Sequence, residues 1–315
     1  MPQITTSSGL YKLYSFFFLG MMTVSLLAGL ALHQIQHAKN EAFAGSTSEY
    51  IAVKKARKEL NFGLIAAASG KKYVPRNYVD QLPKGLIQIR NSRQKKELFS
   101  ATLLPLILLS NELIREERNR LEDLKTNLGV GLTLTEIDSQ WLNLLRNRYG
   151  ISENIEISTE LVDRILYHCD IIPPSLALAQ AAIESGWGTS RFAQSGNAIF
   201  GQWVWGDDVE GMLPLNRDEG ATHKVRKFNY LIDSVRAYAR NINKNEAYED
   251  VRERRAALRK AGKPISGEYL AQGLSRYSQR GDDYIKDILN LISYNQFAGL
   301  DHSRLAPMNE NQLQL

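Results

Sequence analysis

The stretch PSLALAQAAIESGWGTSRFAQSGNAIFGQW, residues 174–203, starts with the pattern of an apolar helix and continues into a segment rich in glycine and aromatic residues. Proline is tolerated in the first turn of a helix, so Pro174 suits its start. One face of this predicted helix carries Leu176, Ala177, Gln180, Ala181 and Glu184. Gly186 and Gly188 then end the helix, which places Glu184 in its last turn.

Glu184 has the surroundings that a general acid requires. Burial among apolar residues disfavours the charged carboxylate, and so does the negative end of the helix dipole. Both effects raise the pKa of the carboxyl group, as acid catalysis near neutral pH demands. A glutamate near a helix end is usually a solvated surface charge, but the apolar and glycine-rich neighbours here favour a functional acid.

Aromatic and amide side chains follow the helix at short spacing. Trp187, Phe200, Trp203 and Trp205 lie within 19 residues. Aromatic rings pack against the C–H faces of sugars, and Ser195, Asn197 and Gln202 could add hydrogen bonds within a mostly apolar groove. Aromatic rings also fill cores, so we expect at least half of these four to serve packing.

Residues 204–229 change character again, because helix formers become scarce and glycine and proline interrupt the segment. A small β-hairpin or loop lobe fits this composition. The segment holds five carboxylates that could face Glu184 across a cleft, namely Asp207, Asp208, Glu210, Asp218 and Glu219. Two carboxylates that flank a scissile bond are the general arrangement for glycoside hydrolysis.

The stretch LAQAAIESGWGTSRFAQSGNAIFGQW, residues 178–203, resembles the signature of glycoside hydrolase family seventy-three. The order of ESGWGTSRFA, GNAIFGQW, RDEGATHKVRKF, AYARNINKNEAY and GLSRYSQRG is similar to that of the bacterial Bax-type proteins of the glucosaminidase superfamily. The resemblance implies a mainly α, lysozyme-like, two-lobed helical domain with a small β-hairpin lobe. It also implies cleavage of the β-1,4 bond after N-acetylglucosamine in peptidoglycan glycan strands.

The same resemblance implies roles for individual residues. Glu184 matches the general acid of the family, and Glu219 matches the second catalytic carboxylate, with Asp218, Glu210 or no second acid as alternatives. Tyr277 falls where related enzymes have a tyrosine in the groove, and core packing is its alternative. The expected substrate-binding residues are Trp187, Asn197, Phe200, Gln202, Trp203 and Tyr277.

Two other function classes stay open at this stage. A lytic transglycosylase also uses a single glutamate on a lysozyme-like helix and needs no hydrolytic water. A non-catalytic wall-binding or assembly protein could retain the same fold as a scaffold, because fold alone does not establish function.

Cysteine and histidine usage argues against a metal or another cofactor. The single cysteine, Cys169, excludes an internal disulfide and lies in an apolar stretch typical of a buried thiol. The five histidines do not cluster with cysteine or carboxylates at ligand spacing. We therefore expect no metal and no cofactor.

The N-terminal segment indicates the location of the protein. Residues 13–32 form a run of 20 residues without a charge, enough to span a bilayer as a helix. Lys12 precedes the run, which favours export of the rest of the chain. We expect a single-pass anchor in the bacterial inner membrane with the catalytic domain in the periplasm. A signal peptide cleaved near AFA, residues 42–44, would release it there instead.

The chain divides by composition into a membrane anchor or signal segment (1–45), a basic linker (46–97), a helical N-terminal extension (98–150), a glucosaminidase-like catalytic domain (151–299) and a polar tail (300–315). Between Lys54 and Glu97, 12 basic residues outnumber 3 acidic ones. This excess suits anionic lipid or wall polymer, or a solvated linker. It lacks the interleaved aromatics of a nucleic-acid reader, so no nucleic-acid partner is expected.

Residues 248–264, YEDVRERRAALRKAGKP, form a dense charge run that predicts a solvated helix. Any of its arginines that face the cleft could instead meet carboxylates of peptides attached to the glycan. Arg236 and Arg240, on the preceding predicted helix, are expected to be solvated.

Overall fold

The computed structural model describes residues 63–206, 209–214 and 222–308, and residues 63–306 of these belong to one compact unit. Its α-helices are α3 (Leu64–Ala68), α4 (Ser92–Gly129), α5 (Glu136–Tyr149), α6 (Thr159–His168), α7 (Pro174–Ser185), α8 (Arg191–Gly196), α9 (Leu231–Lys244), α10 (Glu249–Lys260), α11 (Gly267–Ala271) and α12 (Asp282–Tyr294). Short 3₁₀ helices are η2 (Lys84–Leu86), η3 (Glu246–Tyr248) and η4 (Phe297–His302). The fold is therefore mainly α, as expected.

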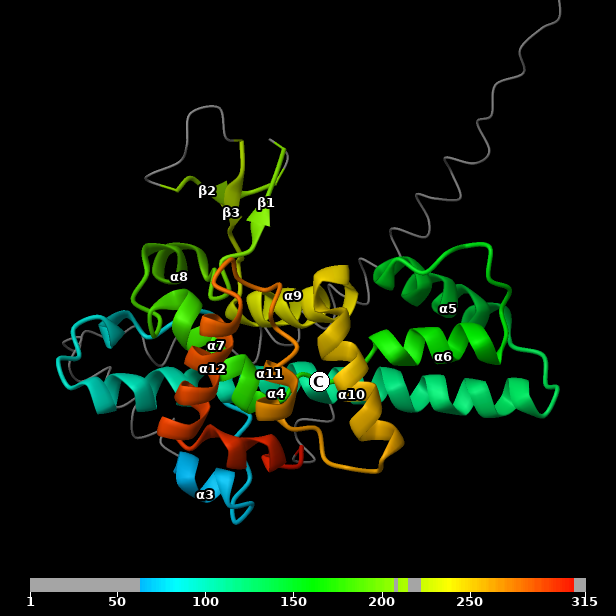
Figure 1. Cartoon of the computed structure of the whole chain (residues 1–315), viewed down its shortest axis with the longest axis horizontal. Helices are drawn as coiled ribbons and strands as arrows, with labels where there is room; N and C mark the ends of the chain where they lie inside the picture. Colours follow the sequence, from blue (N-terminus) through cyan, green and yellow to red (C-terminus); the bar gives the residue numbers. More distant parts are fainter. Residues whose placement is uncertain (1–62, 207–208, 215–221, 309–315) are drawn as a thin grey trace, which may run out of the picture. The chain divides into compact units, whose positions relative to one another are not determined.

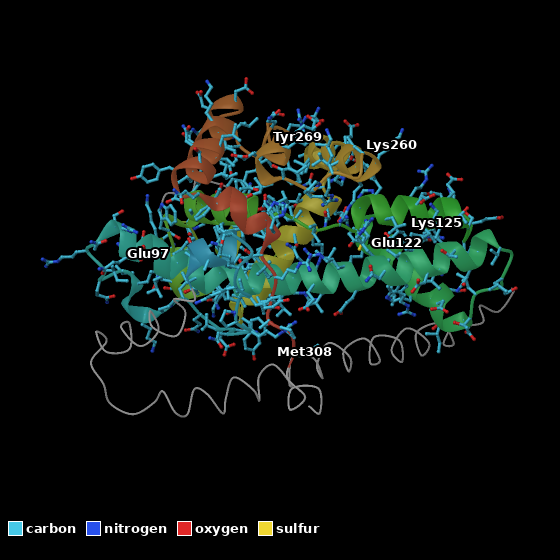
Figure 2. All side chains as sticks on the ribbon, turned by 90° about the horizontal axis from the view of Figure 1, so that it is seen from below. Glu97, Glu122, Lys125, Lys260, Tyr269 and Met308 are labelled. Carbon is cyan, nitrogen blue, oxygen red and sulfur yellow. The ribbon has the colours of Figure 1, made fainter. Side chains whose placement is uncertain are left out.

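Helix α4 runs through the whole unit and takes part in both hydrophobic cores (Figure 1). At 38 residues, it measures about 57 Å from end to end. Its N-terminal half packs with α7 and α9 in the larger core, and its C-terminal half packs with α5 and α6 in the smaller one. In the C-terminal half, the buried Leu121 and Leu124 alternate with charged side chains such as Glu122 and Lys125 (Figure 2).

Among the described residues, α4 is the helix whose length and hydropathy would permit a membrane crossing. However, 72% of its most apolar window is buried inside the fold, so α4 serves here as a core helix. The predicted membrane segment at 13–32 and the AFA sequence at 42–44 lie outside the described residues.

Local capping signals define several helix ends. The Thr135 hydroxyl accepts a hydrogen bond from the Asp138 backbone N–H at 3.1 Å and begins α5. Gly150, which follows α5, adopts the left-handed conformation. Gly186 does the same after α7, so the predicted end of that helix is confirmed.

The small lobe is a three-stranded antiparallel sheet in the order β1 (Trp203–Val204), β3 (Lys224–Arg226), β2 (Gly211–Met212). Trp203 pairs with Val225, and Val225 also pairs with Met212. The sheet adjoins α8, because the Phe228 backbone N–H donates to the Gly196 carbonyl at 2.9 Å. A small β-lobe next to the α7–α8 segment is thus confirmed.

Two expected segment boundaries differ from the observed packing. Residue 98, expected to begin an extension, lies inside α4. Residues 63–97, expected as part of a linker, pack on the fold: Val74 pairs with Leu305, and the fully buried Leu86 joins the larger core. The excess of basic residues predicts a linker, but apolar residues in the same segment pack against the fold.

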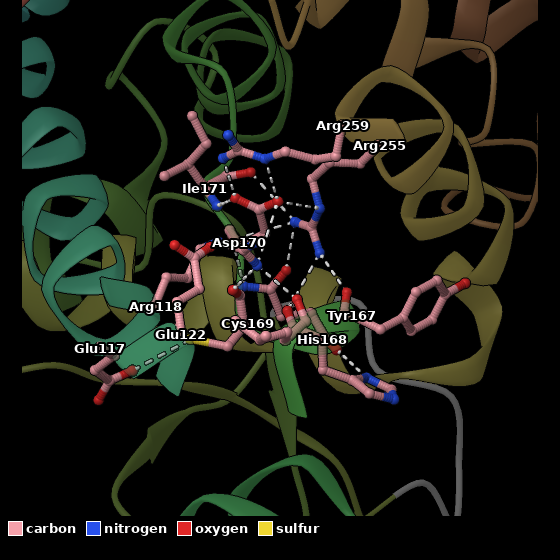
Figure 3. Close-up of polar contacts among 12 residues, drawn as sticks. Glu117, Arg118, Glu122, Tyr167, His168, Cys169, Asp170, Ile171, Arg255 and Arg259 are labelled. Atoms are coloured by element: carbon pink, nitrogen blue, oxygen red, sulfur yellow. Dashed lines mark hydrogen bonds and ion pairs between the residues drawn. The ribbon is translucent and has the colours of Figure 1, made fainter. Parts of the chain in front are cut away.

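A buried ionic cluster around Asp170 joins α4, α6 and α10 (Figure 3). Asp170 is only 3% exposed and accepts two hydrogen bonds from Arg259, at 2.7 and 3.0 Å. Arg255, 1% exposed, donates to backbone carbonyls at the end of α6, including that of His168 at 3.2 Å. The arginine-rich helix α10 is therefore not simply solvated as expected, because Arg252 and Arg255 point into the fold.

The charge state of Asp170 follows from its partners. Burial acts to raise its pKa, but the hydrogen bonds from Arg259 and the charges of Arg255 and Arg118 outweigh burial and lower it. The ionised form is therefore favoured in the folded protein. Its contribution to stability is present above the ordinary aspartate pKa of about 4 and is lost as the pH falls through the lower folded value.

We expect Asp170→Asn to lower the free energy of unfolding by about 3 to 5 kcal/mol, because it leaves buried arginine charges uncompensated. Urea unfolding at pH 7 measures the loss. The control is Asp163→Asn, which removes a half-exposed partner of Lys125 and should cost less than about 1 kcal/mol. The stabilities of the wild-type and Asp170→Asn proteins should converge as the pH is lowered below about 4. Equal losses in the two variants, or a gap unchanged in acid, would contradict this role.

Candidate active site

Helix α7 is held at both ends by the C-terminal part of the chain. At its N-terminal end, the Asp301 carboxylate of η4 accepts hydrogen bonds from the Ser175 backbone N–H at 2.8 Å and the Ser175 hydroxyl at 2.9 Å. The Gly267 backbone N–H of α11 donates to the same carboxylate at 2.9 Å. At the C-terminal end, α12 contacts Glu184. These contacts hold α7, and with it Glu184, in one position.

A directed hydrogen-bond chain ends on Glu184. The Tyr238 hydroxyl donates to Gln180 Oε1 at 2.6 Å, and Gln180 Nε2 donates to the Tyr284 hydroxyl oxygen at 3.1 Å. The Tyr284 hydroxyl then donates to Glu184 Oε1 at 2.9 Å. Each tyrosine hydroxyl has one proton to donate. The direction of every hydrogen bond in the chain is therefore fixed, and Glu184 Oε1 is an acceptor. This arrangement leaves Glu184 Oε2 as the oxygen that can carry a proton.

The pKa of Glu184 is raised above its ordinary value. Burial at the end of the apolar helix raises the pKa, and the hydrogen bond from Tyr284 lowers it by a smaller amount. The direction agrees with the one expected from the sequence, and burial is its main cause. A carboxyl group in this state can hold a proton closer to neutral pH than a solvated glutamate can.

Aromatic rings pack around this hydrogen-bond chain. Tyr277 stacks on Tyr284 with ring centres 5.3 Å apart, and Tyr248 lies 5.5 Å from Tyr277. Phe200 stacks on Tyr238 at 4.0 Å. Of the residues predicted from sequence, Tyr277 and Phe200 thus lie against the tyrosines that position Glu184. Tyr277 is partly exposed, whereas Phe200 is buried.

The turn after Glu184 has an unusual backbone, since Gly186, Trp187 and Gly188 are all left-handed, with φ of 59°, 58° and 76°. A bulky residue such as tryptophan rarely adopts this conformation. The Trp187 ring packs against Phe99 at 5.7 Å and Phe297 at 6.4 Å, which holds it in place. The structure thus places Trp187 in packing between α4 and η4.

Gly188 in this turn tolerates no side chain. A Cβ atom there would lie 2.8 Å from Leu86 and 2.9 Å from Phe99. The close approach explains why η2 can cover the turn directly. The glycine-rich pattern after Glu184 therefore reflects tight packing as well as the end of the helix.

Asn197 is buried and holds neighbouring backbone segments together. It is 4% exposed, and its Nδ2 donates to the carbonyls of Phe228 at 3.1 Å and Asn229 at 3.2 Å. Its own backbone is left-handed at the end of α8. These contacts tie the α8 turn to the segment between β3 and α9.

Gln202 and Trp203 lie on a different surface from Trp187. Both line a cavity beside β1 and α9, and Trp203 stacks on His223 with ring centres 4.3 Å apart. The structure thus separates the six predicted binding residues into two near the tyrosine cluster, two in packing and two at this cavity.

The second carboxylate is not placed by the structure. Glu219 and Asp218 lie outside the described residues, as do Asp207 and Asp208. The described lobe carboxylate Glu210 forms an ion pair with Lys227 at 2.5 Å. In the described part of the chain, no group of three or more histidine, cysteine or carboxylate side chains is placed to hold a metal.

The sequence does not single out Tyr284 and Tyr238 as residues that position the acid. They lie 100 and 58 residues from the residues they contact, beyond the reach of any local pattern. Gln180 offered the one usable signal, because a polar residue on an apolar helix face one turn before Glu184 needs buried hydrogen-bond partners.

Comparisons with known proteins identify a related family for the segment that holds Glu184. Residues 164–297 match the family model described as "Glucosaminidase: Mannosyl-glycoprotein endo-beta-N-acetylglucosaminidase". Protein bax of Escherichia coli (strain K12) is 29% identical over 212 residues, which cover 64% of this chain and 70% of that protein. No solved structure matches significantly.

The matched segment contains α7, the left-handed turn, the β-lobe and both tyrosines of the hydrogen-bond chain. A domain of this family supports a glycosidase-type enzyme in general terms. Residues 164–297 therefore match a glucosaminidase domain, and the chain is similar to a Bax-type protein.

Proposed function

We propose that the protein is a peptidoglycan hydrolase that cleaves the β-1,4 glycosidic bond after N-acetylglucosamine, with Glu184 as general acid. One observation carries the proposal: within the glucosaminidase domain, a carboxyl group with a raised pKa ends an apolar helix and is oriented by a tyrosine. Oriented acids of this kind are what glycosidic bond cleavage needs.

The geometry suggests how proton donation proceeds. Tyr284 occupies Glu184 Oε1, so the proton resides on Oε2 and passes to the glycosidic oxygen while positive charge develops on the sugar ring. As Glu184 becomes a carboxylate, the hydrogen bond from Tyr284 strengthens, because bonds to charged acceptors are stronger. Tyr284 thus favours the state that follows proton transfer over the state that precedes it.

The second half of the reaction is assigned to the β-lobe. Glu219, or its neighbour Asp218, would act as base on water, or would stabilise the oxocarbenium charge while the acetamido oxygen of the substrate attacks. The separation of the two carboxylates decides between these mechanisms. Tyr277, stacked beside Tyr284 and partly exposed, would contact the acetamido group or a sugar face.

We place the enzyme at the bacterial inner membrane. The uncharged run at residues 13–32 would anchor the chain once and put the catalytic domain in the periplasm, where its glycan substrate lies. Cleavage near residues 42–44 would instead release the domain into the same compartment.

The first test digests purified peptidoglycan with the full-length chain in mild detergent and with Glu184→Gln. Mass spectrometry after borohydride reduction should find new reduced N-acetylglucosamine ends. Glu184→Gln should lower their rate of formation at least about 100-fold, because the amide cannot donate the proton as a carboxylic acid does.

The outcomes of this digestion separate the function classes. Anhydro-muramyl ends would assign the protein to the lytic transglycosylases. No new ends from folded wild-type protein would favour a binding or assembly role. Equal activity of Glu184→Gln and wild type would exclude Glu184 as the acid.

A second prediction follows from the hydrogen bond of Tyr284. This bond lowers the pKa of Glu184, so its removal in Tyr284→Phe should raise that pKa further. The acid must be protonated to act, and therefore the alkaline limb of the kcat/KM profile should move to higher pH. The maximum rate should fall, because the departing carboxylate loses its stabilising partner.

Tyr294→Phe is the matched control, since Tyr294 lies on the same helix but is 80% exposed. Its pH profile should coincide with that of the wild type. An unshifted or acid-shifted alkaline limb in Tyr284→Phe would refute the proposed link between Tyr284 and the acid.

A further inference from the structure

A cavity of about 690 Å³ lies between β1, α9, η3 and the end of α5. This volume falls within the usual range for small-ligand sites. Its lining combines three kinds of group: the cations Arg226, Arg240 and Lys244, the exposed rings Trp203 and Trp205, and amides such as Gln202. Such a mixture suits a ligand that has both a sugar-like face and a charged group.

The charge of the lining is positive and poorly compensated. Three cations face one lining carboxylate, Glu246. Within the described residues, no carboxylate lies within ion-pair distance of Arg226, Arg240 or Lys244. Among the residues that the structure describes, the cavity lining therefore carries an excess of positive charge that favours an anion.

The neighbours of Arg240 add to this excess. The pKa of Arg240 is lowered by burial, then by the positive charges of Arg148, Arg236 and Arg226. Asp233 interacts with the same arginines, and burial raises its pKa while their charges lower it, so its carboxyl group offsets part of this positive charge. A ligand carboxylate would relieve this repulsion.

The amide of Gln202 supplies an unfilled acceptor. Its Oε1 atom is buried and has no hydrogen-bond partner among the described residues. Buried polar atoms are nearly always paired, so this unpaired acceptor in a residue of the cavity lining is an exception.

The two tryptophans form an exposed aromatic edge. Trp203 and Trp205 are 58% and 61% exposed, and their rings meet edge to face with centres 6.4 Å apart. His223 covers one face of Trp203 at 4.3 Å, which fixes the orientation of that ring. Flat, oriented aromatic surface of this kind suits the C–H face of a sugar or a peptide backbone.

Contacts connect this cavity to Glu184. Asn241, in the cavity wall, interacts with the Tyr248 hydroxyl, and Tyr248 packs on Tyr277. Tyr277 stacks on Tyr284, which donates to Glu184. The cavity wall and the tyrosines that position Glu184 thus belong to one continuous set of side-chain contacts.

We propose that this cavity binds a carboxylate-bearing substituent of the glycan strand, through Arg226 and Arg240, and so selects anionic wall glycan over uncharged amino-sugar polymer. The inference rests on the proposed glycosidase function of Glu184. The carboxylate belongs either to a peptide attached to the sugar or to the sugar's own lactyl ether group.

The test compares wild type with the double variant Arg226→Gln, Arg240→Gln on three substrates, using the full-length chain in detergent. The substrates are chitooligosaccharide, which is uncharged, peptide-bearing glycan strands, and strands from which an amidase has removed the peptides. We expect kcat/KM to fall at least about tenfold on the preferred anionic substrate, as for loss of a charge-assisted contact. The rate on chitooligosaccharide should stay within about twofold of wild type.

The three arms identify the source of the carboxylate. A loss confined to peptide-bearing strands assigns the site to the peptide, and a loss confined to stripped strands assigns it to the lactyl group. Lys260→Gln removes an exposed charge at the end of α10 (Figure 2) and should change none of the three rates. Equal losses on all three substrates, or no loss on either anionic one, would overturn the proposal.

A binding measurement separates this inference from the proposed activity. Calorimetric titration of both proteins with a soluble disaccharide-peptide, with the same disaccharide free of peptide and with chitotetraose needs no turnover. Weaker binding of an anionic ligand by the double variant, with chitotetraose unchanged, would support the cavity even if the wild type cleaved nothing. Unchanged binding of all three ligands would refute the cavity while leaving any cleavage by Glu184 intact.

Discussion

The carboxylate of Asp170 is the constraint on which the arrangement of the helices depends. It lies just after α6 and before the prolines that start α7, and it accepts hydrogen bonds from Arg259 of α10. Arg255 of the same helix binds carbonyls at the end of α6, including that of His168. A buried charge without a partner is costly. Loss of any one charge in this cluster would therefore lower the free energy of unfolding by several kcal/mol. The cluster thus fixes α6 against α10 at the point where the chain enters α7.

The position of the acid follows from that entry point. Once the start of α7 is fixed, Asp301 satisfies backbone and hydroxyl donors at its first turn, and Tyr284 meets its last turn. Both partners come from the C-terminal segment, so folding of that segment completes the site. Burial raises the pKa of Glu184, and a raised pKa suits a carboxyl group to act as a general acid.

The β-lobe and α9 provide a second surface with a different chemistry. Around Glu184 the neighbours are tyrosines and one amide, without cationic side chains in the hydrogen-bond chain. At the cavity beside β1 the neighbours include Arg226 and Arg240, and Trp203 supplies exposed aromatic surface. An environment without nearby cations favours the protonated form of Glu184. A separate cationic surface can attract an anionic substrate, whereas cations placed next to Glu184 would favour its charged form.

The sequence by itself determined the helix that carries Glu184, its end at Gly186 and the small lobe after it, because caps and apolar periodicity act over a few residues. Only the tertiary structure decided which side chains serve function and which serve packing. Trp187 lies in the motif yet packs against α4, and Arg255 lies in a charge run yet is buried beside Asp170. Tyr284 joins Glu184 across 100 residues, since long-range packing, rather than local pattern, selects the partner of a buried polar group.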